Sequence, residues 1–248
     1  HMRKLNWFAE RGMSEPKLME LIDLVALGTV ADVVPLDENN RILVHQGLQR
    51  IRAGKARPGI QALIEIAKRD AKRLVASDFG FALGPRINAA GRLDDMSFGV
   101  EVLMSNNIHA ARRMASELDG LNQTRKEIEE GMKQEAMAFC ERLQFGENSE
   151  LPYGLALFQR DWHQGVIGIV ASRIVDKYLK PTFLIAIDDS GKGKGSGRSL
   201  DGVNIYSALN ECSDLLEEFG GHAGLIGYMR KSQHRLPLYQ FGSIHWPA

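Results

Sequence analysis

The sequence predicts an α/β protein with two lobes joined by a long helix. One observation comes from residues 153–187, where an apolar run, a helix-compatible run and a second apolar run follow one another. This strand–helix–strand order is the unit of a parallel sheet. The other comes from residues 108–143, which contain almost no helix-breaking residues. A helix of that length reaches roughly 50 Å, more than one small domain needs, so we expect it to join two lobes.

The composition is that of a globular chain. With 248 residues, 44% of them hydrophobic and 25% charged, it can form one large or two modest domains with a proper core. The 31 basic and 31 acidic residues balance, so any nucleic-acid site must be a local patch. Cys140 and Cys212 lack metal-ligand spacing, which favours a reduced, cytoplasmic protein. No apolar run is long enough to span a membrane, and His1-Met2 resembles a cloning remnant before a piece of a larger protein.

Two helices are expected early in the chain, over residues 39–52 and 58–68, because apolar residues recur there at helical spacing. Before them, Asp32 interrupts the apolar passage Leu21–Leu36. A buried carboxylate is costly unless it is paired, hydrogen-bonded or metal-bound. Asp32 is therefore either part of a site or a residue of a helix N-cap or turn, where aspartate is common.

The segment Gly84–Asp95 combines terminal glycines and small residues with Arg86 and Arg92, which flank Asn88. The planar guanidinium of arginine grips phosphate, and small neighbours let a backbone approach closely. These features predict a phosphate-binding role. The alternative is that the two adjacent aspartates at the end of the segment form ion pairs with the arginines.

The long helical stretch has an alternative interpretation as a coiled-coil dimer arm, but its apolar heptad pattern is not sustained. The polar run Gly146–Glu150 follows it. We expect the boundary between the two lobes at this run.

Trp162 and His163 stand at the end of the first expected strand, before a glycine-containing turn and a helix-compatible run. Backbone N–H groups at a helix start are unpaired and lie at the positive end of the helix dipole, which suits a phosphate. The alternative is an ordinary strand–helix connection of an α/β domain.

Two glycine-rich segments follow the second expected strand. Asp188–Ser199 alternates glycine with lysine and then reads Ser196-Gly197-Arg198, which offers amides, a hydroxyl and cations in one flexible loop. Such a loop suits phosphate, and a solvated hairpin turn is the alternative. After a helix expected over residues 203–216, the segment Phe219–Gly224 is interpreted as a glycine turn that presents His222.

Five of these segments are distinctive when they are taken together. They are LGTVADVVPL (Leu27–Leu36), GPRINAAGRLDD (Gly84–Asp95), WHQGVIGIVASR (Trp162–Arg173), GSGRS (Gly195–Ser199) and FGGHAG (Phe219–Gly224). In this order, and separated by a long helix, they resemble the RecJ-type single-strand-specific exonucleases of the DHH phosphoesterase superfamily. The resemblance extends from about Leu5 to Gly227.

The resemblance implies two lobes with different tasks. Residues 1–106 would be the remainder of a DHH phosphoesterase lobe, 107–145 the connecting helix, and 150–227 the DHH-associated substrate-binding domain. The first lobe of that family holds two divalent metal ions, and its last metal-binding aspartate falls on Asp32. The residues implied in holding or positioning DNA are Arg86, Asn88, Arg92, His163, Ser196, Gly197, Arg198 and His222.

The implied activity is metal-dependent hydrolysis of single-stranded DNA in the 5′-to-3′ direction, in DNA repair and recombination. Two Mn²⁺ or Mg²⁺ ions would activate a water and neutralise charge on the phosphate. The implied partners are single-stranded DNA with a 5′ end and, in the cell, a single-strand-binding protein and a helicase. The implied location is the cytoplasm, without a membrane.

The chain departs from the family pattern in two respects. The segment Leu225–Ala248 does not follow the family's continuation after the Gly-Gly-His motif, so we expect residues 228–248 to be a divergent, poorly packed tail. The chain also contains no Asp-His-His triplet, which would precede Met2. We therefore expect the chain alone neither to bind the metal pair nor to hydrolyse DNA. Two other functions stay open: a module that binds single-stranded nucleic acid without cutting it, and a DHH phosphoesterase that acts on small nucleotides such as cyclic dinucleotides.

Overall fold

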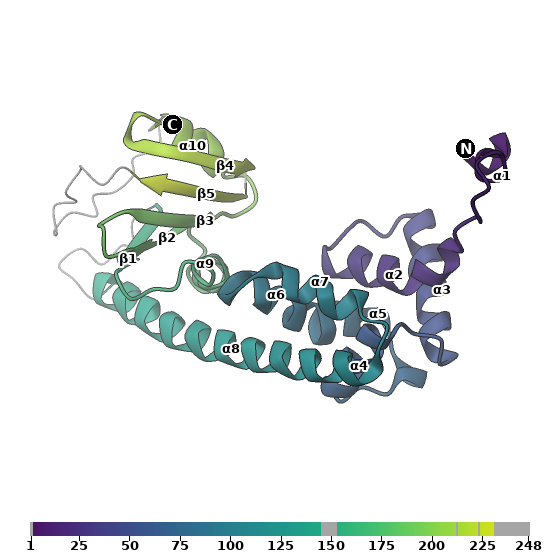
Figure 1. The fold of residues 1–248 in the computed structure, drawn as a ribbon. Helices are drawn as coiled ribbons and strands as arrows, with labels where there is room; N and C mark the ends of the chain where they lie inside the picture. Colours follow the sequence, from purple (N-terminus) through teal and green to yellow (C-terminus); the bar gives the residue numbers. More distant parts are fainter. Residues whose placement is uncertain (1, 145–152, 212, 223, 231–248) are drawn as a thin grey trace. The chain divides into compact units, whose positions relative to one another are not determined.

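The computed structural model describes residues 2–144, 153–211, 213–222 and 224–230. The chain divides into two compact units, unit 1 (His1–Gln123) and unit 2 (Thr124–Ala248). Helix α8 (Ile108–Gln144) contributes residues to both units, and the described part of unit 2 contains a five-stranded sheet (Figure 1). The predicted α/β fold class with a long helix is confirmed. The polar run expected at the lobe boundary lies outside the described residues.

Unit 1 is helical over its described residues, and its helices begin where the local sequence favours a start. The side chain of Asp37 accepts a hydrogen bond from the amide of Asn40 at 2.8 Å and so caps α3. Helix α4 begins with Pro58, whose missing N–H would have no partner there. Both helices confirm the sequence prediction. The elements are η1 (Met2–Leu5), α1 (Trp7–Glu10), η2 (Leu18–Leu21), α2 (Ile22–Ala31), α3 (Glu38–Arg52), α4 (Pro58–Ile66), η3 (Ala71–Arg73), α5 (Ala76–Asp78), the π-helical turn η4 (Phe79–Leu83), α6 (Gly84–Leu93) and α7 (Met96–Met104).

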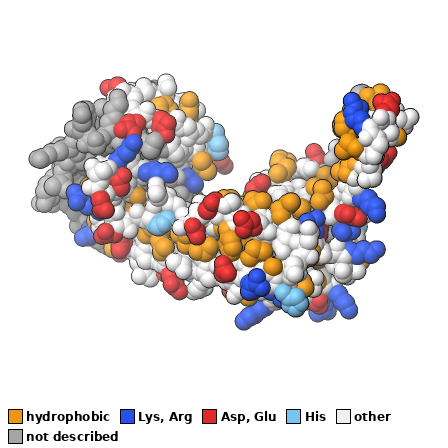
Figure 2. All heavy atoms as spheres, in the orientation of Figure 1, with side chains coloured by type: hydrophobic (Ala, Val, Ile, Leu, Met, Phe, Trp, Pro, Cys, Tyr) orange, Lys and Arg blue, Asp and Glu red, His pale blue; other side chains and the backbone are white. Residues whose placement is uncertain are grey.

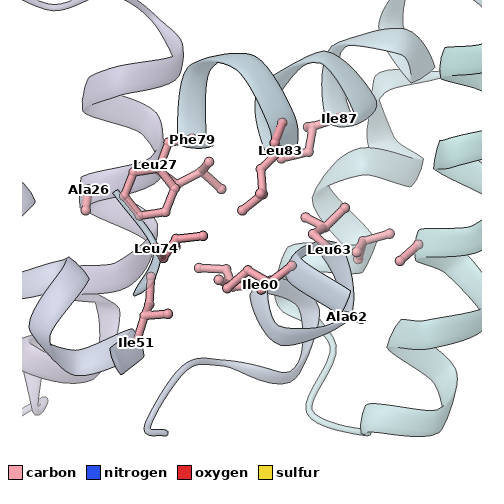
Figure 3. Packing of buried hydrophobic residues seen from close by; sticks show 14 of the residues in the cluster. Ala26, Leu27, Ile51, Ile60, Ala62, Leu63, Leu74, Phe79, Leu83 and Ile87 are labelled. Atoms are coloured by element: carbon pink, nitrogen blue, oxygen red, sulfur yellow. The ribbon is translucent and has the colours of Figure 1, made fainter. Parts of the chain in front are cut away.

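The core of unit 1 is apolar and takes residues from α2, α3, α4, η4, α6, α7 and α8; Figure 3 shows part of it. Phe79 and Leu83 of η4 are fully buried in it, and Phe79 lies beside Leu27 of α2 (Figure 3). Each such side chain contributes about 1.5–3 kcal/mol by leaving water. This packing fixes η4, and therefore the start of α6, against the end of α2.

One carboxylate, Asp23, is completely buried in unit 1. It accepts hydrogen bonds from the amides of Leu24 and Arg57, both at 2.9 Å, and lies 4.0 Å from Nε of Arg50. These donors compensate the cost of burying the charge. Asp23 therefore joins α2 to the residue that precedes α4.

A close approach between α4 and α7 requires a glycine at position 59. A β-carbon there would lie 2.0 Å from the carbonyl oxygen of Val102, a backbone atom that can yield only if the helices move apart. We expect Gly59→Ala to destabilise the protein by about 3 kcal/mol, the upper end of the cost of overpacking. Gly120→Ala is the control: nothing lies within 4 Å of its β-carbon, and it should stabilise α8 by about 0.5–1 kcal/mol. Urea unfolding measures both, and a loss of stability shared equally by the two variants would contradict this interpretation.

Unit 2 is built on a sheet with the strand order β1-β2-β3-β5-β4 (Figure 1). Strands β1 and β2 are parallel and are joined through α9, which confirms the expected strand–helix–strand unit. The other neighbouring strands are antiparallel. The elements are β1 (Leu155–Gln159), α9 (Ile167–Tyr178), β2 (Thr182–Ile187), β3 (Gly193–Arg198), α10 (Ile205–Glu211), η5 (Ser213–Leu215), β4 (Leu216–His222) and β5 (Leu225–Arg230).

The two glycine-rich segments of unit 2 are strands, which corrects the expected loop and turn. The run that ends at Arg198 forms β3 in the middle of the sheet, and the run that ends at His222 forms β4. A β-carbon on Gly197 would lie 2.7 Å from the ring of Phe183 and 2.8 Å from Ile226, so large neighbours fill the space above the glycine. Glycine weakens strand propensity in isolation, but such packing overrides it.

The end of the described chain also differs from expectation. The helix expected over residues 203–216 is the shorter α10, followed by η5. Strand β5 continues to Arg230 and so includes the first residues of the segment expected to be a divergent tail. The rest of that segment, 231–248, lies outside the described residues.

The second half of α8 belongs to unit 2. Glu129 of α8 forms ion pairs with Arg125 on the same helix and with Arg173 of α9. Cys140 is buried, and burial raises the pKa of its thiol to about 11, so it stays protonated at neutral pH and does not act as a nucleophile. Among the described helices, none has both the length and the apolar character needed to cross a membrane.

Candidate nucleic-acid interface

The site predicted in unit 2 lies at the start of α9, after the turn that follows β1. The carbonyl of His163 accepts hydrogen bonds from the amides of Val166 and Ile167, at 2.9 and 3.2 Å. Its ring Nδ1 accepts from the amide of Gly165 at 3.1 Å, so the neutral ring carries its proton on Nε2. A strand end and a helix start therefore meet at His163, as the sequence predicts. The amides of Gly165, Val166 and Ile167 are bonded to His163, which corrects the expectation that the N–H groups at this helix start are unpaired.

Strand β3 presents Ser196 and Arg198 to the first turn of α9. The two residues share one face of the strand, since side chains alternate along it. A β-carbon on Gly168 would lie 2.6 Å from Nη2 of Arg198 and 2.9 Å from Oγ of Ser196, so only glycine permits this approach. Nη1 of Arg198 donates to Oγ of Ser196 and to the carbonyl of Gly197, both at 2.8 Å. A guanidinium, a hydroxyl and a helix N-terminus thus lie together, an arrangement suited to phosphate.

His222 lies in the same register of the sheet. Leu225 of β5 pairs with Arg198 on one side and with His222 on the other, so the two residues are separated by two strand spacings, about 10 Å. His222 is exposed, and its Nδ1 accepts a hydrogen bond from the amide of Gly224 at 3.3 Å. Gly221 has φ +150, and a β-carbon there would lie 2.2 Å from the carbonyl oxygen of Leu225. The glycine of this motif is therefore required by the pairing of β4 with β5.

A cavity of about 350 Å³ opens at the carboxyl ends of β1 and β2. This is the edge at which open α/β sheets bind their ligands. A second cavity, of about 420 Å³ beside Tyr153 and Pro181, lies at the opposite ends of these strands and away from every predicted residue. The first cavity is therefore the relevant one. Its lining includes Arg160, Trp162, His163, Ile187, Lys192 and Lys194.

Of the basic residues of this cavity, Arg160 was missed in the sequence, whereas Lys192 and Lys194 belong to the glycine–lysine segment predicted to suit phosphate. Lys192 forms an ion pair with Glu217 at 2.7 Å, and this hydrogen bond raises the pKa of the lysine. Arg160 lies in the turn after β1, and Lys194 lies on β3 two residues before Ser196. Strand alternation would have placed Lys194 beside Ser196, but only if the segment had been recognised as a strand.

Trp162 was the aromatic residue best placed to stack on a base, in a chain with only 7% aromatic residues. In the structure its side chain is 4% exposed, and its indole N–H donates to Glu135 of α8 at 2.9 Å. The ring is therefore used to attach the turn after β1 to α8. It does not offer a face for stacking.

The predicted metal ligand, Asp32, lies in unit 1 at the C-terminal end of α2. It is exposed, and its amide donates to the carbonyl of Gly28 at 3.0 Å. A β-carbon on Gly84 would lie 3.3 Å from that of Ala31, so the first turn of α6 packs directly beside this helix end. Phe81 nearby is 86% exposed. Asp32 thus lies on an open surface with apolar side chains around it.

The predicted phosphate-binding segment forms helix α6. Asn88 and Arg92 are exposed and lie one turn apart on the same face of the helix as Gly84. This face adjoins the end of α2, where Asp32 is found.

Arg86 makes structural contacts within unit 1. Its Nε lies 2.7 Å from Asp119 of α8, and its Nη1 donates to the carbonyl of Ala82 at 2.6 Å. For Arg86, the ion-pair partner is thus Asp119 and not one of the two aspartates at the end of the segment. Asp95 caps α7 by accepting a hydrogen bond from the amide of Ser97, which lowers the pKa of Asp95. A direct role of Arg86 in binding DNA stays a prediction.

The described residues assemble no complete metal site. Among them, no group of three or more His, Cys, Asp or Glu side chains is arranged to hold a metal ion. One exposed carboxylate does not supply the ligands of two divalent ions. Any such centre needs donors from elsewhere.

Comparison with known proteins supports the predicted family. The family model of the DHHA1 domain matches residues 151–238. The chain is 58% identical over 231 residues to the single-stranded-DNA-specific exonuclease RecJ of Dickeya dadantii, which covers 92% of this chain and 40% of that protein. It is 54% identical over 248 residues to the protein of the same name from Escherichia coli, which covers 98% of this chain and 43% of that protein.

The chain belongs to the RecJ family. It spans about two fifths of the length of these RecJ proteins. Crystal structures of RecJ from Thermus thermophilus, described as complexes with Mg²⁺ and with Mn²⁺, each match 90% of the chain with a TM-score of 0.75 and 33% identity. The match covers 33% and 32% of those chains. The fold of this chain is thus that of part of RecJ.

Proposed function

We propose that this chain is the strand-holding part of a single-strand-specific RecJ exonuclease. The observation that carries the proposal is the cluster at the start of α9, where Gly168 allows Arg198 and Ser196 to lie against the helix N-terminus. A guanidinium, a hydroxyl and the positive end of a helix dipole are groups that hold a phosphate backbone without reading its bases. The proposed DNA-binding surface also includes His163 and His222. Gly197 contributes indirectly, because the packing of β3 requires a glycine at this position.

The proposal assigns unit 1 a share in the reaction. Asp32 would be one ligand of a Mn²⁺ or Mg²⁺ centre, and Asn88 and Arg92 would hold the strand near it. The described residues do not supply enough ligands for two metal ions, so the metal-dependent step would need ligands from elsewhere in the RecJ protein. The exposed apolar surface at Phe81 supports completion of the centre by another part of the RecJ protein. The chain alone is then proposed to be inactive as a nuclease.

The whole RecJ protein would hydrolyse DNA in the 5′-to-3′ direction, in DNA repair and recombination in the cytoplasm. Single-stranded DNA with a 5′ end is the proposed substrate, and a single-strand-binding protein and a helicase are the proposed partners. The names of the RecJ relatives support the exonuclease activity on single-stranded DNA. The direction, the cellular role and the protein partners rest on the resemblance alone.

A competition experiment separates this proposal from an activity on small nucleotides. The chain is titrated with a labelled single-stranded oligonucleotide, and unlabelled single strand, duplex and a cyclic dinucleotide are added as competitors. We expect the single strand to compete at the lowest concentration, because a flexible backbone can adapt to the groups at the start of α9 better than a stiff duplex can. Stronger competition by the cyclic dinucleotide would overturn the proposal in favour of a small-nucleotide phosphoesterase.

A further inference from the structure

The cavity at the carboxyl ends of β1 and β2 carries positive charge that the described residues do not neutralise. Among the described residues, neither the guanidinium of Arg160 nor the ammonium of Lys194 has an ion-pair partner. Asp188 is the one acidic residue of the lining, and it is occupied: it accepts hydrogen bonds from Ser190 at 2.6 Å and from the amide of Lys192 at 2.9 Å. Two cations therefore remain for a ligand.

These cations come from separate elements and meet at one cavity. Arg160 follows β1 and Lys194 lies on β3, and both line the cavity together with His163. The ring of His163 is held through Nδ1, which leaves Nε2 as a donor. Figure 2 shows Lys, Arg and His side chains close together over β3 and the start of α9. Ile187 adds an apolar wall, which suits a sugar or base.

The spacing along β3 relates this cavity to the cluster at Arg198. Lys194 and Ser196 lie on the same face of the strand, two residues apart, which corresponds to roughly 6.6 Å. Neighbouring phosphates of an extended single strand are separated by one sugar and have a comparable spacing. A strand that follows β3 would therefore bring consecutive phosphates to the two places.

We propose that Arg160, Lys194 and His163 form a second phosphate subsite, which holds the backbone phosphate adjacent to the one held by Ser196 and Arg198. This inference rests on the proposed function. It adds the alignment of the DNA strand with β3. Two consecutive backbone phosphates are held along this strand, so the chain binds a dinucleotide step rather than an isolated phosphate. Lys192 takes little part, because Glu217 already neutralises it.

Oligonucleotides in which one phosphate at a time is replaced by a neutral methylphosphonate test this alignment. For the unmodified chain, we expect two consecutive positions at which the replacement weakens binding about tenfold, the loss of one charge-assisted contact. In the double variant Arg160→Ala/Lys194→Ala, the replacement at one of the two positions should no longer weaken binding. In Arg198→Ala, the replacement at the other position should no longer weaken binding. This loss of sensitivity is the coupling that a double-mutant cycle measures. The double variant should also lower the salt-dependence slope by about 0.7, the value for the one phosphate that the second subsite holds on a single strand.

Lys180→Ala is the control variant. Lys180 lies just before the amino end of β2, over the ring of Tyr153, whereas the cavity lies at the carboxyl end of the strand. The variant should leave the affinity and both sensitive positions unchanged. If Arg198→Ala weakens binding but the double variant keeps both sensitive positions, or if these positions are not consecutive, the second subsite is overturned and the proposed function stands. If the unmodified chain does not bind single-stranded DNA, both are overturned.

Discussion

Replacing Arg198 with alanine is expected to weaken the binding of single-stranded DNA about tenfold or more at physiological salt. The guanidinium lies against the first turn of α9 and holds the hydroxyl of Ser196, so its removal takes away a cation and loosens a second contact. The salt-dependence slope should fall by about 0.7, the value for one phosphate contact on a single strand. Fluorescence anisotropy over a series of salt concentrations measures both quantities.

Two variants make this result specific. Arg198→Lys keeps the charge but loses the planar fork, and should recover only part of the affinity. Lys177→Ala removes one positive charge at the far end of α9, where the lysine pairs with Glu141, and should change the affinity less than twofold. Equal losses for Lys177→Ala and Arg198→Ala would show that net charge, and not the cluster at the helix start, determines binding.

Replacing Asp23 with alanine is expected to destabilise the protein by about 3–5 kcal/mol, the cost of breaking a buried charged network by removing one partner. The side chain is fully buried, and its loss leaves the amides of Leu24 and Arg57 without their acceptor and removes the charge that faces Arg50. Urea unfolding followed by circular dichroism measures the loss. Hydrogen exchange in α2 and α3 should localise it to unit 1.

Glu117 supplies the comparison for Asp23. It is an exposed acidic residue of α8, and Glu117→Ala should change stability by no more than about 0.5 kcal/mol. Asp23→Asn keeps the shape of the side chain and one acceptor oxygen. Its loss of stability should lie between those of Glu117→Ala and Asp23→Ala. A loss below about 1 kcal/mol for Asp23→Ala would mean that the buried carboxylate is dispensable, contrary to the role assigned to it.

The regular elements were accessible from the sequence because their signals are local. Helical spacing and a breaker-free run predicted α3, α4 and α8, and short apolar runs predicted the parallel pair β1 and β2. Strands β3 and β4 were not accessible, since their glycines are explained by neighbours distant in sequence: Phe183 and Ile226 fill the space over Gly197. The strand propensity of the residues themselves does not reflect contacts with neighbours distant in sequence.

The residues of the candidate site likewise fall into those that the local sequence could indicate and those that depend on distant neighbours. His163 and Arg198 could be singled out because residue type and turn context indicate phosphate chemistry. The sequence did not show that Trp162 would be buried against α8, because its partner, Glu135, lies 27 residues away. Asp23 was overlooked because an aspartate within an apolar helix gives no sign of which amides it accepts from.

The central claim is that this chain holds single-stranded DNA but does not complete the metal centre that cuts it. The direct test incubates the purified 248-residue chain with a labelled single-stranded oligonucleotide and Mn²⁺, and records anisotropy and oligonucleotide length in the same sample. We predict a rise in anisotropy with the oligonucleotide at full length. Progressive shortening of the oligonucleotide, abolished by a chelator, would contradict the claim.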